Sequence, residues 1–323
     1  MTTAFLTHPD CLRHDMGGSH PEQPARLTTI ESALQTAGLL KFLHRLEARP
    51  ATREQLLRAH DAAYLDEIEH TAPQSGLAFL DPDTAMNPYS LSAALHAAGA
   101  LTQAVDCVMQ GCAANAFCAV RPPGHHALRH RAMGFCIFNN VAIGALHALE
   151  AHGLQRVAIV DFDVHHGNGT EDIFHDDPRV MLCSSFQHPY YPFSGADSGN
   201  EHIIPLPLAA GSGSEEFRKA WLARGLPALE RFQPQMIFFS AGFDAHRDDP
   251  LAGLMLVEDD FAWITGQVLR IAYCCAQGRV VSTLEGGYEL EALGLSVAAH
   301  IQALSKLRGE VNEPHSMNVV RLL

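Results

Sequence analysis

Basic charge is the first thing that this sequence lacks. The 323 residues hold 22 Lys and Arg against 36 Asp and Glu, which gives a net charge of −14 at pH 7. No run of basic residues interrupts the chain. We therefore expect neither a nucleic-acid partner nor an anionic membrane surface, whereas a cationic partner suits this charge.

Long apolar runs and paired cysteines are absent as well. No eighteen apolar residues stand together, and the first residues, MTTAFLTHPDCLRHD, lack a basic start followed by an apolar core. These absences predict no membrane-spanning helix and no export signal. The eight cysteines contain no CxxC pair, so neither a disulfide framework nor a zinc knuckle is indicated. We expect a protein of the reducing cytoplasm.

Short apolar runs alternate with amphipathic segments along the whole chain, and no Gly/Ser-rich or Pro-rich linker divides it. A single α/β domain over residues 1–323 is predicted. The runs at 116–120, 157–160, 180–183, 236–239 and 280–284 read as parallel strands buried on both faces. Helices are predicted over 91–108, 217–229 and 261–275. Gly111 and Gly278 are expected to end the first and third, and Ser212 with Glu215 predicts a capping box for the second.

Histidine is abundant, with 20 residues, and its placement points to a site. Parallel α/β sheets bind ligands at the carboxyl ends of their strands. The predicted strands are followed by RPPGHHA, DFDVHHGNG, Ser184-Ser185, SAGFDAHRDDPLAG and EGGYE. Each segment alone has an ordinary explanation, such as a turn or a buried hydrogen bond. Their occurrence after five strands indicates one common site.

Asp163, His165 and Asp244 are the candidate metal ligands among these residues. On an extended strand, Asp163 and His165 would lie on the same side, about 6.6 to 7 Å apart. Three protein ligands leave one position open for water, a pattern typical of catalytic zinc, although Fe²⁺ or Co²⁺ would also fit. Such an ion would polarise a carbonyl group and acidify water. With the adjacent histidines and the tyrosine of EGGYE as base and oxyanion donor, the set predicts amide hydrolysis.

The four motifs RPPGHHA, DFDVHHGNG, GFDAHRDDPLAG and LEGGYE resemble those of the zinc-dependent histone deacetylase family in order and spacing. HPEQPARL, at residues 20–27, resembles that family too, so the resemblance covers about residues 1–305 and leaves 306–323 as an unmatched tail. Asn168 is similar to the class II branch and to bacterial deacetylase-like and acetylpolyamine amidohydrolases, where class I enzymes have aspartate. The resemblance implies the arginase/deacetylase fold, an α/β architecture. It is a single, mostly parallel sheet of about eight strands flanked by helices, with the active site at the C-terminal ends of the strands.

The resemblance also implies roles for metal-binding residues. It makes Asp163, His165 and Asp244 the zinc ligands, with potassium bound behind them and at a second, more peripheral site. The implied donors of the first potassium site are Asp161, Ser184 and the backbones of Asp163, His165 and Ser185, and those of the second are carbonyls near Phe174, Asp177 and Val180. From the residues alone, Ser184 would be an ordinary strand hydroxyl.

Tyr288 and the tandem histidines are the implied catalytic groups. Tyr288 would donate a hydrogen bond to the transition state. Asp161 beside His125 favours an imidazolium there, whereas the neutral amide of Asn168 can orient His126 and leave it neutral. We therefore predict His126 as the base that passes its proton to the leaving amine. His166 is predicted to be a structural histidine of the turn.

Substrate contacts are implied less directly. Phe135 and Tyr191 match the two aromatic walls around an acyl-lysine stem, with Tyr191 replacing the commoner phenylalanine. Leu251 stands where a polyamine-selective branch carries glutamate, and an apolar rim gives a second ammonium no partner, which weakens a polyamine assignment. Asp81 or Asp83 is expected to meet substrate near the rim.

Three glycines and one arginine complete the predicted site. Gly134 belongs to the tunnel wall, and Gly286 and Gly287 allow a close approach of the backbone. Arg26 resembles the arginine of an internal acetate-release channel. The alternative for Arg26 is a surface arginine at the start of a helix.

We expect a zinc-dependent amidohydrolase that removes an acetyl or other acyl group from lysine side chains, with one zinc ion and one or two potassium ions as cofactors. The expected partners are an acyl-lysine peptide or an acetylpolyamine, and homo-oligomers are possible. An acetylpolyamine deacetylase is the alternative. A dimanganese ureohydrolase is less expected because PGHH and DVHHG replace GGDH and DAHxD patterns. An acyl-ligand binder without activity remains open, although such proteins typically lose a ligand or the tyrosine.

Overall fold

The computed structural model describes residues 2–198 and 200–306 of the chain. In that part, eight strands form one sheet, and every neighbouring pair in it is parallel. Their order across the sheet is β2-β1-β5-β10-β9-β6-β7-β8. The strands are β1 (Thr3–Thr7), β2 (Leu43–Glu47), β5 (Asn115–Cys118), β6 (Val157–Asp161), β7 (Val180–Gln187), β8 (Ile203–Leu208), β9 (Ile237–Ala241) and β10 (Val280–Leu284). The prediction of about eight mostly parallel strands is confirmed.

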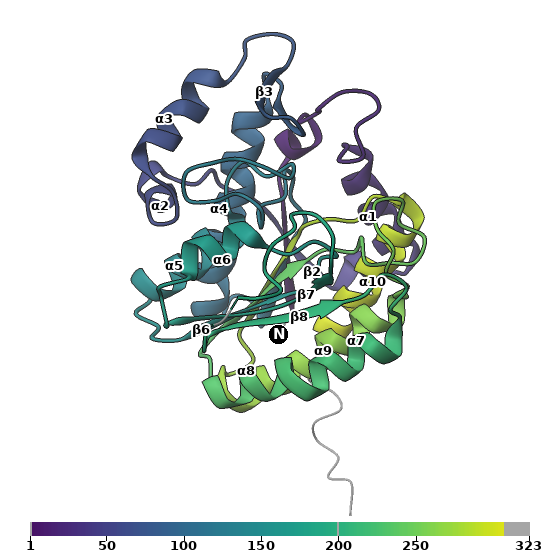
Figure 1. Cartoon of the computed structure of the whole chain (residues 1–323). Coiled ribbons are helices and arrows are strands. Elements are labelled where there is room, and N and C mark those ends of the chain that lie inside the picture. The colour runs from purple at the N-terminus through teal and green to yellow at the C-terminus, as the bar shows by residue number, and fades with distance from the viewer. Residues whose placement is uncertain (1, 199, 307–323) are drawn as a thin grey trace, which may run out of the picture.

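Helices cover both faces of this sheet (Figure 1). On one face lie α4 (Ser90–Met109), α5 (Asn140–Glu150) and α6 (Asn168–Phe174). The other face carries α1 (Ala25–Thr36), α7 (Ser214–Ala220), α8 (Leu226–Phe232), α9 (Glu258–Cys275) and α10 (Leu290–Lys306). Shorter elements are η1 (Pro9–Leu12), η2 (Leu40–Phe42), η3 (Trp221–Gly225), α2 (Arg53–Leu57) and α3 (Ala62–Thr71).

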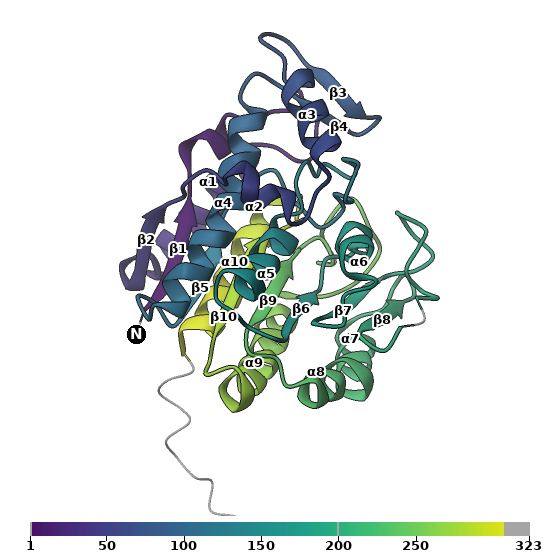
Figure 2. The same ribbon diagram turned by 90° about the vertical axis from the view of Figure 1, so that its left-hand side faces the viewer.

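A small hairpin stands apart from the main sheet. Strands β3 (Ala78–Asp81) and β4 (Thr84–Met86) pair antiparallel and project beside α3 at the top of Figure 2. The carboxyl ends of the central strands point toward the same part of the molecule. The hairpin therefore borders the edge of the sheet at which parallel strands gather ligands.

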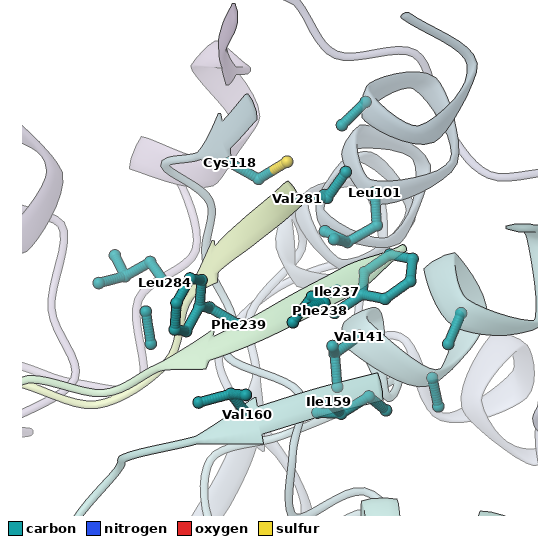
Figure 3. Close-up of a cluster of buried hydrophobic side chains, with 14 of the residues drawn as sticks. Leu101, Cys118, Val141, Ile159, Val160, Ile237, Phe238, Phe239, Val281 and Leu284 are labelled. Atoms are coloured by element: carbon teal, nitrogen blue, oxygen red, sulfur yellow. The ribbon is translucent and has the colours of Figure 1, made fainter. Parts of the chain in front are cut away.

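The core forms where the central strands meet the helices. Figure 3 shows Leu101 of α4 and Val141 of α5 against Ile159 of β6 and Phe238 of β9, and all four are fully buried. Neighbouring side chains of a strand point to opposite faces, so strands covered on both sides need continuous apolar runs. This is why β6 (VAIVD), β9 (IFFSA) and β10 (VVSTL) are mostly apolar and buried along their whole length.

Most sequence predictions of elements agree with this architecture. All five predicted strands and the helices over 91–108 and 261–275 are present, and Gly111 and Gly278 follow their helices with φ of 76° each. The predicted helix over 217–229 is a continuous helical stretch of α7, η3 and α8.

The predicted capping box of α7 is wrong by one residue. The N-cap is Gly213, and its N–H donates to Glu216 Oε2 at 3.0 Å, so Ser212 and Glu215 play no part in the box. The neighbouring Ser214 hydroxyl instead donates to Asp260 Oδ2 at 2.7 Å, a tertiary contact that the local pattern does not contain.

Three strands of the main sheet, β1, β2 and β8, and both strands of the β3–β4 hairpin were not predicted. β2 and β8 are the two edges of the sheet. β8 contains Pro205 and Pro207, which are tolerated at an edge because a proline there needs no ladder hydrogen bond.

No helix within residues 2–198 and 200–306 is both long enough and apolar enough to cross a membrane. The predicted C-terminal tail begins inside α10, which continues through Lys306. Its remaining residues, 307–323, lie outside the described residues, and the prediction for them stays untested.

Candidate active site

The predicted site residues converge at the carboxyl ends of four neighbouring strands, whereas Ser184 and Ser185, predicted to follow a fifth strand, lie inside β7 (Val180–Gln187). The loop after β5 carries His125 and His126, and the segment after β6 carries Asp163 and His165. β9 is followed by Asp244, and β10 by Tyr288. Because β5, β10, β9 and β6 are adjacent in the sheet, their loops meet at one place.

Asp163, His165 and Asp244 form a buried group whose ligand atoms lie within 4.8 Å of one another. His165 Nδ1 is 3.1 Å from Asp163 Oδ1 and 3.1 Å from Asp244 Oδ2. The other carboxylate oxygens are held by backbone amides, since Asp163 Oδ2 accepts from Gly286 and Asp244 Oδ1 accepts from Val164. One imidazole nitrogen and two carboxylate oxygens are thus oriented toward a common point, which is the donor set of a catalytic zinc site.

The charge at this point favours a cation. Burial and the neighbouring Asp163 carboxylate raise the pKa of Asp244 to about 7. Burial opposes protonation of His165, but the hydrogen-bonded carboxylates outweigh it and raise the pKa of that imidazole to about 10. Asp163 and Asp244 both face the His165 Nδ1 atom, and a divalent cation in place of the proton on that nitrogen would neutralise the two carboxylates. The residues present therefore fit a zinc ion.

The prediction that an extended strand places Asp163 and His165 on one side is wrong. β6 ends at Asp161, so Asp163 and His165 do not share one side of an extended strand. Instead, Asp161 Oδ1 accepts the Asp163 N–H at 3.1 Å, and Asp163 Oδ1 accepts the His165 N–H at 2.8 Å. Two successive side-chain turns after the strand bring the two ligands together.

His125 is built to be a cation. Its Nδ1 lies 3.0 Å from Asp161 Oδ2, and its Nε2 lies 3.7 Å from Asp163 Oδ2. Burial opposes protonation, but Asp163 and Asp161 outweigh it and raise the pKa of His125 to about 10. At neutral pH this ring carries a proton on each nitrogen.

His126 has the opposite environment. Burial, followed by the charges on His125 and His165, lowers the pKa of His126 well below its ordinary value of 6.5. Its Nδ1 lies 2.7 Å from Asn168 Oδ1. An amide oxygen accepts, so Nδ1 carries the hydrogen and Nε2 has the free lone pair. The tandem histidines are thus a cation and a neutral base.

His166, adjacent to the predicted zinc ligand His165, is buried and directed elsewhere. Its Nε2 is 2.7 Å from Glu171 Oε2, and Glu171 also accepts a hydrogen bond from Ser198. Gly195 packs on the His166 ring, where an added Cβ would meet it at 2.4 Å. These contacts fit the predicted structural role of His166.

Tyr288 presents a neutral hydroxyl to the site. Burial, and after it the Asp244 carboxylate, raises the pKa of Tyr288 well above 10. Its backbone N–H donates to Asp249 Oδ2 at 2.7 Å, and the Asp249 carboxylate also accepts from the Leu251 N–H at 3.0 Å. The hydroxyl is therefore protonated at neutral pH and can donate a hydrogen bond.

A cavity of about 170 Å³ joins these groups to the surface. Most of the predicted substrate-binding residues line it together with His126, His165 and Tyr288. The lining residues are Asp83, His126, Gly134, Phe135, His165, Tyr190, Tyr191, Leu251 and Tyr288. Of the two aspartates considered for the rim, Asp83 is the one in the lining. Gly286 and Gly287 lie behind the cavity rather than in its wall, and Gly286 sits where an added Cβ would meet Asp244 Oδ2 at 2.1 Å.

The aromatic walls are held in place by distant segments. Phe135 has a φ of 69°, an uncommon backbone conformation for a bulky residue. Its N–H donates to Thr84 Oγ1 at 3.0 Å, and the Gly134 N–H donates to Asp83 Oδ1 at 3.1 Å. The β3–β4 hairpin therefore fixes this wall. The opposite wall, Tyr191, meets the His126 ring edge-on at 5.3 Å.

Arg26 is fully buried, so the alternative of a surface arginine is wrong. Its Nε donates to the Gly287 carbonyl at 2.7 Å, its Nη2 donates to the Glu285 carbonyl, and its guanidinium lies 5.0 Å from the centre of the Tyr288 ring. Glu22 accepts from Arg26 Nη1 at 3.1 Å. The predicted role in acetate release stays a prediction, and the contacts place Arg26 behind the EGGY segment.

Glu22 is the centre of a buried ion cluster that sequence reasoning missed. It pairs with Arg121 through both oxygens, with Arg26, and with His14 at 3.4 Å. Burial opposes ionisation, but Arg121 and His14 outweigh it and hold the pKa of Glu22 well below its usual range. HPEQPARL, the motif that contains Glu22, was the available signal.

The first predicted potassium site has the donors that such an ion needs. Asp161 and Ser184 are paired in register across β6 and β7. The hydroxyls of Ser184 and Ser185 are buried, and neither has a hydrogen-bond partner among the described residues. Buried hydroxyls are normally paired, so the Ser184 hydroxyl, on the same face of the sheet as its register partner Asp161, fits a bound cation. The Ser185 side chain points to the opposite face, and its predicted donor is the backbone.

The second predicted potassium site lies in the turn before β7. The carbonyl of Phe174 accepts from Asp177 N and lies 3.1 Å from His202 Nε2, and the carbonyl of Asp177 accepts from Val180 N. These carbonyls already have partners, and this site stays a prediction.

Glu285 and Tyr190 were also missed. Glu285 follows β10 inside the LEGGYE motif and is fully buried. The Tyr190 ring lies nearly parallel to His165 at 5.7 Å, and its hydroxyl donates to the Leu251 carbonyl across the cavity mouth. Both residues lie in motifs that follow strands, so their place near the site could have been predicted. Their hydrogen-bond partners could not, because those lie in distant parts of the chain.

Two further groups of histidine and aspartate lie outside this site, at His8, Asp10 and His96 and at Asp106, His147 and His152. In the second group both histidine Nε2 atoms approach Asp106 Oδ1, at 2.8 and 2.7 Å. His147 Nδ1 lies 2.9 Å from Arg58 Nη1, which can only donate, so Nε2 keeps its hydrogen and has no lone pair for a metal. The buried Asp163 group remains the best candidate metal centre.

Comparison with known proteins places these features in context. The chain matches the model of the histone deacetylase domain over residues 20–304. It is 39% identical over 336 residues to the histone deacetylase-like amidohydrolase of Pseudomonas aeruginosa, covering 97% of this chain and 88% of that protein. It is 37% identical over 331 residues to the human polyamine deacetylase HDAC10, covering 94% of this chain and 48% of that protein. The fold matches the crystal structure of the HDA15 HD domain with a TM-score of 0.88 at 33% identity, covering 94% of this chain and 90% of that one. The predicted arginase/deacetylase fold is confirmed.

Proposed function

Since this chain belongs to the histone deacetylase family and is a hydrolase that acts on amide bonds, we propose that it removes the acetyl group from acylated lysine side chains in a zinc-dependent reaction. One observation carries the proposal. The donor atoms of Asp163, His165 and Asp244 converge at a narrow cavity whose lining also contains His126 and Tyr288. The proposed metal ligands, the base and the hydroxyl donor are therefore all close enough to act on one amide group of a substrate.

Asp163, His165 and Asp244 would hold the zinc ion, which would supply polarisation of the amide carbonyl and a more acidic water molecule. His126 Nε2 has a free lone pair and takes the proton from that water. The Tyr288 hydroxyl donates to the oxygen on which negative charge develops. His125 remains protonated beside Asp161 and stabilises that charge electrostatically. The water oxygen bonds to the amide carbon, and His126 then gives the proton to the amide nitrogen as the C–N bond breaks, which releases acetate and the free amine.

The cavity supports a lysine-like stem as the substrate. Phe135 and Tyr191 are apolar ring faces suited to a chain of methylene groups, and Leu251 adds an aliphatic contact at the mouth. A cavity of about 170 Å³ suits one alkyl chain ending in a small acyl group.

Acetylpolyamines are the second candidate substrate class. A relative of this chain is named a polyamine deacetylase. The Asp83 carboxylate in the lining offers a partner for a second ammonium, whereas Leu251 does not. We place acyl-lysine first because the side chain at the mouth is apolar.

The test is release of acetate from an acetyl-lysine peptide by the zinc-loaded enzyme, compared with N-acetylputrescine and N8-acetylspermidine. We expect activity that a chelator removes and zinc restores. Tyr288→Phe should lower kcat by roughly 10²- to 10³-fold, as loss of an oxyanion donor does. Tyr273→Phe, on α9, is the matched control and should leave kcat unchanged.

Three outcomes would overturn parts of this proposal. A kcat/KM at least tenfold higher for the acetylpolyamines would replace the substrate class and keep the mechanism. Two Mn²⁺ per active chain would replace the mechanism with that of a ureohydrolase. Tight binding of acyl-lysine without any turnover would indicate a binder rather than an enzyme. A cytoplasmic location and formation of homo-oligomers stay predictions.

A further inference from the structure

Glu285 is a fully buried carboxylate that lies beside the site without touching the cavity. Its Oε2 accepts from the backbone N–H groups of Gly124 and His125, at 2.6 and 3.1 Å. Its Oε1 accepts from the Ser240 hydroxyl at 2.9 Å. The side chain thus links the segment after β10 to the loop after β5 and to β9.

The two backbone N–H groups that donate to Glu285 belong to the loop that carries the tandem histidines. The His125 amide is part of the peptide backbone that leads directly into His126, and the two imidazole rings lie 4.1 Å apart. Side-chain contacts fix the same loop from the far side, where Asp161 meets His125 and Asn168 meets His126. Asp161 and Asn168 thus hold the two imidazole rings, and Glu285 holds the backbone of the same loop.

The backbone of Glu285 is itself anchored. Its carbonyl accepts from Arg26, its N–H donates to the Ala241 carbonyl at 2.9 Å, and Gly286 next to it donates to Asp163 Oδ2 at 2.8 Å. A displacement of the tandem-histidine loop therefore has to break contacts to a rigid neighbour. Burying a carboxylate is costly unless its hydrogen bonds are made, and here three donors meet it.

We propose that Glu285 is a positioning residue that sets the place of the His126 imidazole relative to the zinc ligands. The inference rests on the proposed role of His126 as the base. Glu285 acts through its hydrogen bonds to the two backbone N–H groups. The position of its acceptor oxygen therefore matters more for kcat than its negative charge. A misplacement of about 1 Å in a reacting group can cost about 100-fold in rate.

Three substitutions of Glu285 separate reach from charge. Glu285→Gln keeps an oxygen at the same distance from both amides and should retain kcat within about fivefold. Glu285→Asp keeps the charge, is one methylene shorter and should lower kcat about 10- to 100-fold, because it cannot reach both amides. Glu285→Ala should lower kcat at least as much. In each case KM should stay within about twofold and zinc content at that of the wild type.

Asp260 provides the matched control. It is a fully buried carboxylate that likewise accepts from a backbone amide, Val257, and from a serine hydroxyl, Ser214, but it lies at the start of α9. Asp260→Ala should lower Tm and leave kcat per folded chain unchanged. If Glu285→Ala does not fold, the kcat values of Glu285→Gln and Glu285→Asp still test whether the position of the oxygen or the charge matters.

The inference fails if Glu285→Asp turns over like the wild type, if Glu285→Gln is as slow as Glu285→Asp, or if zinc content falls with kcat. These failures differ from failure of the proposed function, in which the wild-type enzyme itself shows no zinc-dependent turnover of acetyl-lysine.

Discussion

Asn168→Asp places a carboxylate next to the proposed base and should move the acidic limb of the kcat/KM profile. In the wild type, Asn168 Oδ1 lies 2.7 Å from His126 Nδ1, and the pKa of His126 is well below 6.5. Two opposite charges about 4 Å apart interact by about 4 kcal/mol at an effective dielectric constant of about 20. At 1.36 kcal/mol per pKa unit this is about 3 units.

Desolvation of the new carboxylate consumes part of this energy, so we expect the pKa of His126 to rise by about 1 to 2 units. The base must be neutral to accept a proton. A higher pKa keeps it protonated up to a higher pH, so activity is lost earlier as the pH falls. On the shifted limb the rate should be about 10- to 100-fold below that of the wild type.

The assay is kcat/KM of the zinc-loaded enzyme for an acetyl-lysine peptide between pH 5 and 10. Asn168→Ala is the control, because it removes the hydrogen bond without adding charge and should not move the limb upward. An acidic limb that stays in place in Asn168→Asp, with zinc bound and the fold intact, would refute His126 as the neutral base.

Three further changes probe the metal sites and the fold. Gly286→Ala should abolish zinc binding in a metal analysis, because the added Cβ would lie 2.1 Å from Asp244 Oδ2, whereas Gly266→Ala has open space and should bind zinc normally. Glu22→Gln should lower the free energy of unfolding at pH 7 by about 3 to 5 kcal/mol in denaturant titrations. The depressed pKa of Glu22 means that its contribution is present above about pH 4.5 and fades as the pH falls below it, so a difference that persists undiminished at low pH would contradict this reading. Ser184→Ala should raise the potassium concentration that gives half-maximal activity, and an unchanged potassium dependence would remove this hydroxyl from the ion's ligands.

The proposed zinc ligands and the tandem histidines could be expected at one site from sequence, because each sits in a contiguous motif after an apolar run. His125 and His126 are adjacent in the chain, and Asp163 and His165 are two residues apart. Parallel strands then bring these motifs together without further information, because all their carboxyl ends meet at one edge of the sheet.

The partners of buried polar groups could not be predicted in this way. Glu285 contacts residues that precede it by 160 and 161 positions, and the Glu22 cluster joins segments about 100 residues apart. Such contacts depend on the assembled sheet rather than on local periodicity. The edge strands β2 and β8 were also missed, because neither is a continuous apolar run. β2 (LHRLE) contains three polar residues, and β8 (IIPLPL) contains two prolines.

The β3–β4 hairpin gives the molecule a way to change its substrate without changing its chemistry. Asp83 and Thr84 hold the Gly134–Phe135 wall from outside the sheet, whereas the zinc ligands follow the central strands. The exposed Phe79 and Leu77 at its outer end are free to vary, because the reacting groups place no demand on them. Changes at Asp83 and Thr84, which hold one wall of the cavity, are thus a route to new selectivity that leaves the reacting groups in place.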